Sequence, residues 1–168
     1  MKLRKLEEKD ARLMLEWMHD ESVVRFLGAN FSEKNIQDCV EFIQKAGSYD
    51  TDMHLAVVDD ADIYMGTVSL KHIDHEAGNA EFAISMRNAA MGKGFAHFGM
   101  DEILRLGHEM FGLKHIFWCV SVRNVRAVRF YDKNGYQRVA SDAVPISVRE
   151  RYTDEQQADF LWYVKDFQ

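Results

Sequence analysis

The chain has 168 residues, of which 47% are hydrophobic, and its formal net charge is −6. This length suits one domain with a substantial core, so residues 1–168 are expected to form a single domain. The acidic balance argues against nucleic acid as a partner, because neutralising phosphates needs a basic face, and it would favour a cationic substrate such as an amine. No stretch approaches the ~18 apolar residues of a membrane span, and two cysteines form no disulfide framework. We therefore expect no membrane association and a cytoplasmic protein with reduced thiols.

Helical and extended patterns alternate in the first third of the chain. Residues 1–6 alternate as an edge strand would, and apolar residues at helical spacing predict a helix over about 9–18. A short helix is expected over 21–27. A further helix is expected to begin near Ser32 as its N-cap and to stop at Gly47.

The apolar period then changes to that of strands. Residues 54–58 and 63–72 are predicted strands, and the run of Asp59 to Asp62 between them predicts a turn. A second turn over 75–79 leads to a strand over 80–86. Three strands joined in this way form a mostly antiparallel meander.

The second half of the chain alternates between helices and strands. The predicted elements are a long helix from Gly94 to Gly112, a strand over 115–122, a helix from its N-cap Asn124 to Gly135, a strand over 136–144, a polar loop over 146–158 and a last strand over 160–164. The fold class is therefore α/β, with a mixed, mostly antiparallel, twisted sheet of about seven strands flanked by helices.

A glycine pair stands where the strand over 80–86 leads to the long helix. Gly92 and Gly94 flank Lys93 there. Glycines at such a junction let bare backbone N–H groups face an anion, and the helix dipole favours negative charge. The sequence is no P-loop, because GK is not followed by Ser or Thr, and no dinucleotide fingerprint, because His97 stands where the third glycine belongs. By itself the pair is a weak signal, since most such glycines only pack or cap.

A second strand–helix junction strengthens the prediction of a phosphate site. There the strand over 115–122 leads to the helix that begins at Asn124, and this junction would line the same cleft as the glycine pair. The chain resembles the GCN5-related N-acetyltransferases (GNAT) over nearly its whole length. Their loop pattern [Q/R]-x-x-G-x-[G/A] corresponds to residues 91–96, and their pattern N-x-x-[A/S]-x-x-[F/L]-Y-x-x-x-G-[F/Y] is met by Asn124, Ala127, Phe130, Tyr131, Gly135 and Tyr136. The N-terminal part, residues 3–27, looks most like the branch that acetylates ribosomal-protein N-termini, in which similar sequences act on polyamines, antibiotics and amino sugars.

The resemblance implies a GNAT fold and a set of residues that bind acetyl-CoA, with no metal. The pyrophosphate would rest on the N–H groups of Met91, Gly92, Lys93, Gly94, Phe95 and Ala96. The strand edge at Ile84 and Met86 would splay from residues 119–120 and pair with the pantetheine amides. Asn124 would hydrogen-bond the cofactor arm, and Tyr131 would protonate the leaving thiolate. The alternatives are that Tyr131 only packs in the core and that Asn124 only caps its helix.

The loop departs from the family at its first position, where Met91 replaces Gln or Arg. A charge-assisted phosphate contact is thereby lost unless Lys93 or Arg87 supplies it. Amine acetylation also needs a base, because an ammonium cannot attack a thioester. Glu81 is the first candidate, and its alternative role is to pair with a nearby Arg or Lys.

Other groups offer weaker alternatives for the base and for a metal. His72, His75 and Glu76 lie near the end of the hairpin. Zinc is rejected, because two histidines three residues apart on a strand point to opposite faces. A covalent route is disfavoured, since Cys119 lies in a buried-looking strand away from any plausible base.

The expected function is transfer of acetyl from acetyl-CoA to a primary amine by direct attack. The acceptor stays open among a protein N-terminus, a polyamine, an aminoglycoside and an amino sugar, and segments 19–35 and 145–158 would select it. Rivals are another acyl donor or an O-acceptor, a non-catalytic CoA-binding sensor or interaction module, and, ranked lowest, a dinucleotide enzyme. Aromatics near Trp162 and Tyr163, if exposed, would offer a homodimer surface.

Overall fold

The computed structural model describes all 168 residues and contains one seven-stranded sheet with the order β1-β2-β3-β4-β5-β7-β6. The strands are β1 Lys2–Lys5, β2 Met53–Val58, β3 Tyr64–Asp74, β4 Asn79–Met86, β5 His115–Ser121, β6 Gln137–Val139 and β7 Phe160–Asp166. All neighbours pair antiparallel except β4 and β5, which are parallel. The predicted mixed, mostly antiparallel sheet is confirmed.

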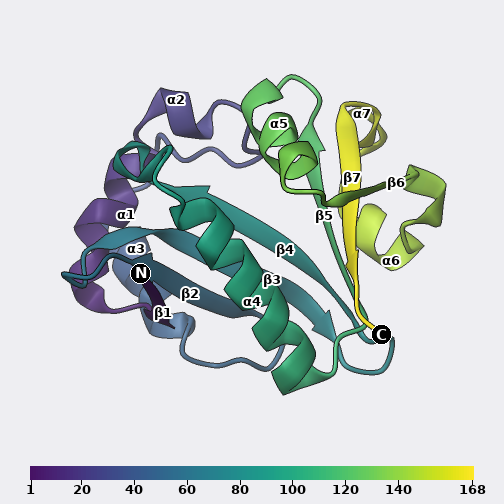
Figure 1. The fold of residues 1–168 in the computed structure, drawn as a ribbon. Coiled ribbons are helices and arrows are strands. Elements are labelled where there is room, and N and C mark those ends of the chain that lie inside the picture. Colours follow the sequence, from purple (N-terminus) through teal and green to yellow (C-terminus); the bar gives the residue numbers. More distant parts are fainter.

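Helices cover both faces of this sheet, as Figure 1 shows. They are α1 Ala11–Met18, α2 Glu21–Val24, α3 Ile36–Lys45, α4 Phe95–Phe111, α5 Val125–Lys133, α6 Ile146–Arg149 and α7 Asp154–Ala158, with 3-10 turns at Glu8–Asp10, Asn88–Ala90 and Ser141–Ala143. Helix α4 crosses one face diagonally, and α3 lies behind the sheet.

Two glycines hold α4 close against the sheet. A Cβ at Gly99 would come within 2.6 Å of Val57, and one at Gly107 within 2.6 Å of Leu70. Larger residues would push the helix off β2 and β3, because packed interiors leave no space for extra methyl groups. This close packing fixes the start of α4 beside the end of β4.

The opposite face has two separate cores. On one side, α1 and α3 cover Ala56, Val58 and Tyr64. On the other, the segment around Val148 packs on Phe117 and Trp162. The strand pair β3–β4 runs between these two covers, which is where a pocket forms.

Three local expectations were wrong. Helix α3 begins at Ile36 with Asn35 as its N-cap, because Asn35 and Asp38 form a capping box, while Ser32 bonds only Asn30. The predicted loop over 146–158 holds α6 and α7, the latter started by a Thr153 capping box. The strand expected over 136–144 is only β6, followed by a 3-10 turn.

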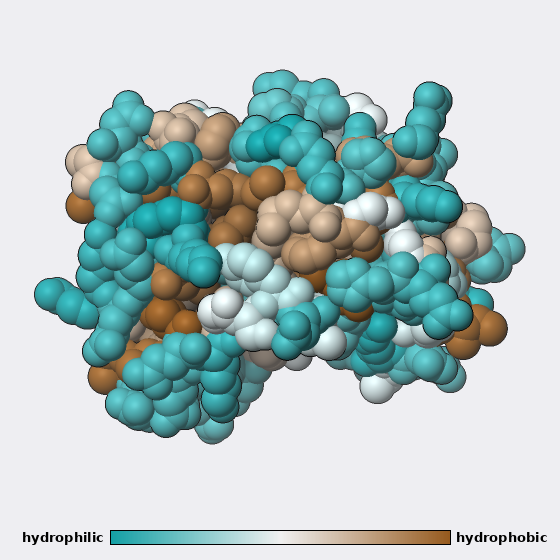
Figure 2. All heavy atoms as spheres, turned by 90° about the horizontal axis from the view of Figure 1, so that it is seen from below, coloured by the Kyte–Doolittle hydropathy of each residue, from teal (hydrophilic) through white to brown (hydrophobic).

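The surface expectations differ too. Trp162 and Tyr163 are 2% and 0% exposed, so the aromatic surface proposed for a homodimer does not exist. Seen from below, the molecule is largely hydrophilic, with apolar residues emerging in the middle of the face (Figure 2). None of the helices combines the length and apolar composition that a membrane crossing requires.

Candidate active site

The parallel strands β4 and β5 separate after three residue pairs. Asn79, Ala80 and Glu81 pair with His115, Ile116 and Phe117, and no pairing follows. Residues 82–86 of β4 stay paired with β3 on their other side. The sheet therefore opens into a wedge, whose apex is Glu81 and whose β4 side offers backbone groups to an extended ligand.

The glycine loop beside this wedge has the geometry that an anion site requires. Gly92 and Gly94 adopt left-handed backbone angles, with φ of 72° and 84°, and Gly94 is the N-cap of α4. No backbone hydrogen bond uses the N–H groups of residues 92–96, whereas the Met91 N–H donates to the Asn88 carbonyl at 3.0 Å. Five of the six predicted amides are thus free to bind an anion, and the sixth is not.

The side chains along this path are mostly buried in the core. Met86 and Phe95 are buried and Ile84 is half-buried, so any contact of these residues with a cofactor falls to their backbone. Lys93 lies at the surface, and Ala96 is partly buried.

Asn124 is the N-cap of helix α5, and Tyr131 lies on the same helix. The Asn124 side-chain oxygen accepts from the Ala127 N–H at 3.2 Å, so the N-cap role is present. Tyr131 is buried, with ring centroids 5.6 Å from Trp118 and 5.0 Å from Tyr163. Burial raises the pKa of its hydroxyl far above the usual range, which keeps the proton in place at neutral pH.

Glu81 is buried on the other face of the sheet, in register with Lys71. Its Oε1 accepts a hydrogen bond from the Tyr152 hydroxyl. Its Oε2 has no hydrogen-bond partner, and the nearest cations are Arg151 Nη1 at 3.6 Å from Oε2 and Lys71 Nζ at 3.9 Å from Oε1. The carboxylate thus has cationic neighbours and still keeps one oxygen available.

Sequence reasoning missed Tyr152, Arg151 and Lys71. Tyr152 lies 71 positions from Glu81, in the segment predicted as a loop. No local pattern marks such a contact, although the pairing of Lys71 with Glu81 could have been found from the hairpin register.

The expectation that Cys119 lies far from any base was wrong. Its thiol faces Glu81 and Tyr152, because Cys119 and Phe117 share a side of β5. Burial first, and then the Glu81 carboxylate, raises the pKa of this thiol to about 12. A protonated thiol is a poor nucleophile, so direct attack remains favoured for a different reason.

Arg87 is placed differently from the expectation, whereas His72, His75 and Glu76 lie near the end of the hairpin as expected. Arg87 donates to both oxygens of Glu16, at 2.9 and 3.2 Å, and to the Tyr64 carbonyl, so it is not available for a phosphate. His75 lies in the hairpin turn, with Nε2 3.3 Å from the Asp50 carbonyl, and Glu76 is beside it. His72 is exposed.

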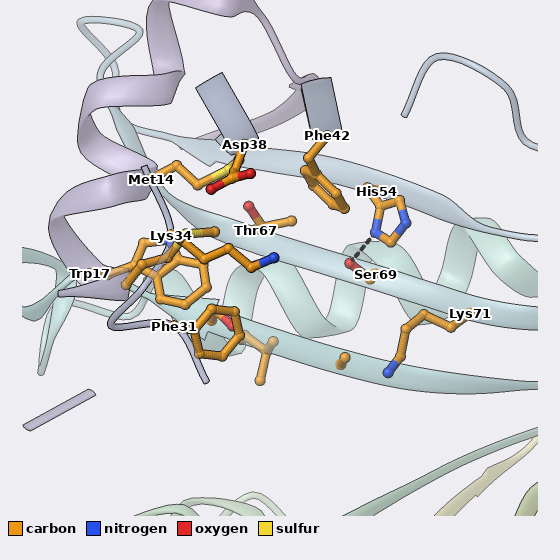
Figure 3. Close-up of a pocket in the computed structure, with 14 residues that line it drawn as sticks. Met14, Trp17, Phe31, Lys34, Asp38, Phe42, His54, Thr67, Ser69 and Lys71 are labelled. Carbon is orange, nitrogen blue, oxygen red and sulfur yellow. Dashed lines mark hydrogen bonds between the residues drawn. The ribbon is translucent and has the colours of Figure 1, made fainter. Parts of the chain in front are cut away.

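A pocket of about 280 Å³ lies on the Glu81 face, between α1, α3 and the strands β3 and β4 (Figure 3). Its lining residues are Met14, Trp17, Met18, Phe31, Lys34, Asp38, Phe42, His54, Thr67, Ser69, Lys71, Ala83, Ile84 and Ser85. Phe31 and Lys34 come from the segment 19–35 that was expected to select the acceptor.

A second, basic depression adjoins the start of α5. It is lined by Arg25, Phe26, Arg123, Asn124, Val125, Arg126 and Arg129. Arg25 and Arg123 lie over the Phe26 ring, at 4.8 and 5.7 Å from its centroid. Elsewhere, no cluster of three or more His, Cys, Asp or Glu side chains could hold a metal ion.

A strand wedge beside free helix-start amides, with a buried tyrosine on one face and a buried carboxylate on the other, is the arrangement expected of an acyl-CoA-dependent transferase. The acetyltransferase (GNAT) domain family model matches residues 1–137, and the chain belongs to this family. It is an acetyl-CoA-dependent N-acetyltransferase, which transfers acetyl to an amine.

Individual relatives are distant. An uncharacterized N-acetyltransferase p20 from Bacillus licheniformis is 23% identical over 139 residues, covering 81% of this chain and 78% of the relative. A chimera of the Vibrio cholerae spermidine N-acetyltransferase has a TM-score of 0.76 at 20% identity, covering 98% of this chain and 94% of its own. The Vibrio cholerae spermidine N-acetyltransferase itself, in complex with CoA and spermine, has a TM-score of 0.73 at 24% identity, covering 83% of this chain and 82% of its own.

These structural likenesses show the fold. Both structures are of spermidine N-acetyltransferases, so they do not support the ribosomal-protein branch expected from the N-terminal residues.

Proposed function

We propose that acetyl transfer proceeds by direct attack of a small-molecule or peptide amine, with Glu81 and Tyr131 serving the two proton transfers. The observation that carries this proposal is their placement on opposite faces of one wedge, at the point where β4 and β5 separate. Glu81 would first take one proton from the substrate ammonium, and the neutral amine would then attack the thioester carbonyl carbon. A nitrogen–carbon bond forms and the carbon–sulfur bond breaks. Tyr131 would give its proton to the leaving thiolate, the second proton that the nitrogen loses would restore Tyr131, and Glu81 would release its proton to solvent.

The residues around the wedge fit acetyl-CoA, which supplies the thioester. The free N–H groups of residues 92–96 suit a diphosphate, since they also lie at the start of a 17-residue helix. The unpaired backbone at Ile84 and Met86 would bind the pantetheine amides, and Asn124 would orient the arm.

Two other arginines are candidates for the phosphate contact that is lost because Met91 stands where the family has Gln or Arg. Arg87 is bound to Glu16, but Arg126 and Arg129 line the depression next to Asn124. These two guanidinium groups would supply the positive charge for cofactor phosphates.

Two broader expectations remain part of the proposal. The single continuous sheet supports residues 1–168 acting as one domain. Cys39 and Cys119 are unpaired, which supports a reducing, cytoplasmic location.

Replacing Tyr131 by Phe tests the proposed chemistry. Loss of a general acid lowers kcat about 100- to 10 000-fold, while KM for acetyl-CoA changes little, because the ring and its packing remain. Tyr49→Phe removes a tyrosine hydroxyl far from the wedge and serves as the matched control. Released thiol measures turnover with each amine class.

A CoA-binding sensor gives a different result. Coenzyme A would raise its melting temperature equally before and after the Tyr131 change, and no acceptor would be turned over by either form. That outcome would contradict the proposed chemistry.

A further inference from the structure

Building on the proposed acetyl transfer, we infer that the acceptor is an amino acid: a small amine with a large apolar or aromatic side chain and a nearby carboxylate. It is not a polyamine. The inference comes from the walls, the charges and the position of the pocket on the Glu81 face.

The side chains that line this pocket suit an apolar group of a ligand. Trp17, Phe31 and Phe42 line it, and Figure 3 shows Phe42 across the pocket from Trp17 and Phe31. Phe31 packs edge-on against Trp17 at 5.1 Å, which fixes both rings. A volume of about 280 Å³ suits one small molecule and not a protein segment.

The two lysines that line the pocket interact little with other groups of the chain. Lys34 and Lys71 both line it, and Figure 3 shows the Lys34 ammonium pointing inward. Neither lysine donates a hydrogen bond to another group of the chain, and the one ion pair between them and a carboxylate is the 3.9 Å approach of Lys71 to Glu81. Each therefore has donors free for an anionic group of a ligand.

The single carboxylate of the pocket is partly engaged within the chain. Asp38 is the only one in the lining, and its Oδ2 accepts from the Asn35 N–H at 2.8 Å in the capping box of α3. His54 shares a hydrogen bond of 2.6 Å with Ser69, and burial lowers its pKa, which favours the neutral ring. A polyamine would place several ammonium groups beside Lys34 and Lys71, with only one lining carboxylate to pair with them, which is costly.

The position of Lys71 sets the distance between the two groups of the acceptor. Lys71 and Glu81 are paired residues of neighbouring strands, with Nζ and Oε1 3.9 Å apart. A carboxylate bound at Lys71 would hold an amine only a few bonds away beside Glu81, the proposed base. An α-amino acid has this spacing, and its side chain would extend toward Trp17 and Phe42.

Phenylalanine, phenylalaninamide, phenethylamine and spermidine separate the possibilities. Their acetylation is followed by released thiol, with kcat/KM as the readout. We expect kcat/KM for phenylalanine to exceed the values for phenylalaninamide and phenethylamine, which lack the carboxylate, by about ten- to a hundred-fold. This factor corresponds to one charge-assisted contact. Lys34→Met and Lys71→Met should remove most of that preference, whereas Lys45→Met, at the exposed end of α3, should leave it intact.

The outcomes are distinct. Equal or better turnover of phenethylamine or spermidine overturns the inference and leaves the acetyltransferase proposal standing. If no amine is turned over, the proposed chemistry fails instead, and calorimetric binding then decides on the pocket. Phenylalanine must bind more tightly than phenethylamine, with a difference that Lys34→Met reduces, or the inference is wrong.

Discussion

Two buried carboxylates in this molecule have opposite surroundings. Asp10, at the corner of β1 and α1, is 2% exposed and accepts from Arg4 Nη1 at 2.7 Å, Arg4 Nη2 at 2.8 Å and the Glu7 N–H at 2.9 Å. Glu81, at the apex of the wedge, is 3% exposed, and its Oε2 has no hydrogen-bond partner. The two carboxylates are equally buried, but only Asp10 has both oxygens hydrogen-bonded.

The difference indicates what each group is for. A buried charge whose oxygens are all bonded holds two elements together, and removing its partner is strongly destabilising. A buried charge that keeps an oxygen free costs stability and is retained where a ligand completes it. The same isosteric change at the two positions should therefore have opposite consequences.

The largest effect is expected from Glu81→Gln. Loss of the proposed base should lower kcat about 100- to 10 000-fold. The free energy of unfolding should change by less than about 2 kcal/mol, since the amide oxygen still accepts from Tyr152 and neither neighbouring cation, at 3.6 and 3.9 Å, donates a hydrogen bond to the carboxylate. Steady-state kinetics and urea unfolding measure the two quantities, and an unchanged kcat would assign Glu81 a purely structural role.

Asp10→Asn should give the reverse result. It breaks the two-point contact with Arg4 and leaves that guanidinium without its main partner, at a cost of about 2–4 kcal/mol in unfolding free energy. Below its lowered melting temperature, the variant should retain kcat. A stability equal to that of the unmodified protein would remove the basis of the comparison.

A smaller effect is expected at the glycine loop, a functional position without charge. Gly94→Ala forces a side chain into a left-handed conformation and should cost about 1–2 kcal/mol. It should also raise KM for acetyl-CoA several-fold, because it shifts the free amides. Gly47→Ala is the control, since Gly47 has neither a positive φ nor a neighbour within 4 Å of the added Cβ. Equal effects at both positions would contradict the proposed phosphate site.

Features that depend on local sequence could be predicted well. Gly94 and Gly112 bound α4, Asn124 caps α5, and Gly135 follows its end, each with the backbone angles or caps expected. Glycines in left-handed positions and side chains that cap helices act within a few residues, so the sequence around them is enough.

Features that depend on long-range contacts could not be predicted. Tyr152 reaches Glu81 from a segment without apolar periodicity, and Arg87 is held by Glu16, 71 positions away. The local charge of the cavities could not be predicted for the same reason. The net charge of −6 agrees with an amine substrate, but the lysines and arginines that line the two cavities come from segments that only the fold brings together.

The most direct test is a crystal structure of the protein with coenzyme A. We expect the diphosphate on the N–H groups of residues 92–96, the pantetheine arm along residues 82–86 of β4, and the thiol between Tyr131 and Glu81. Coenzyme A bound elsewhere, with side chains filling the space between β4 and β5, would contradict the account.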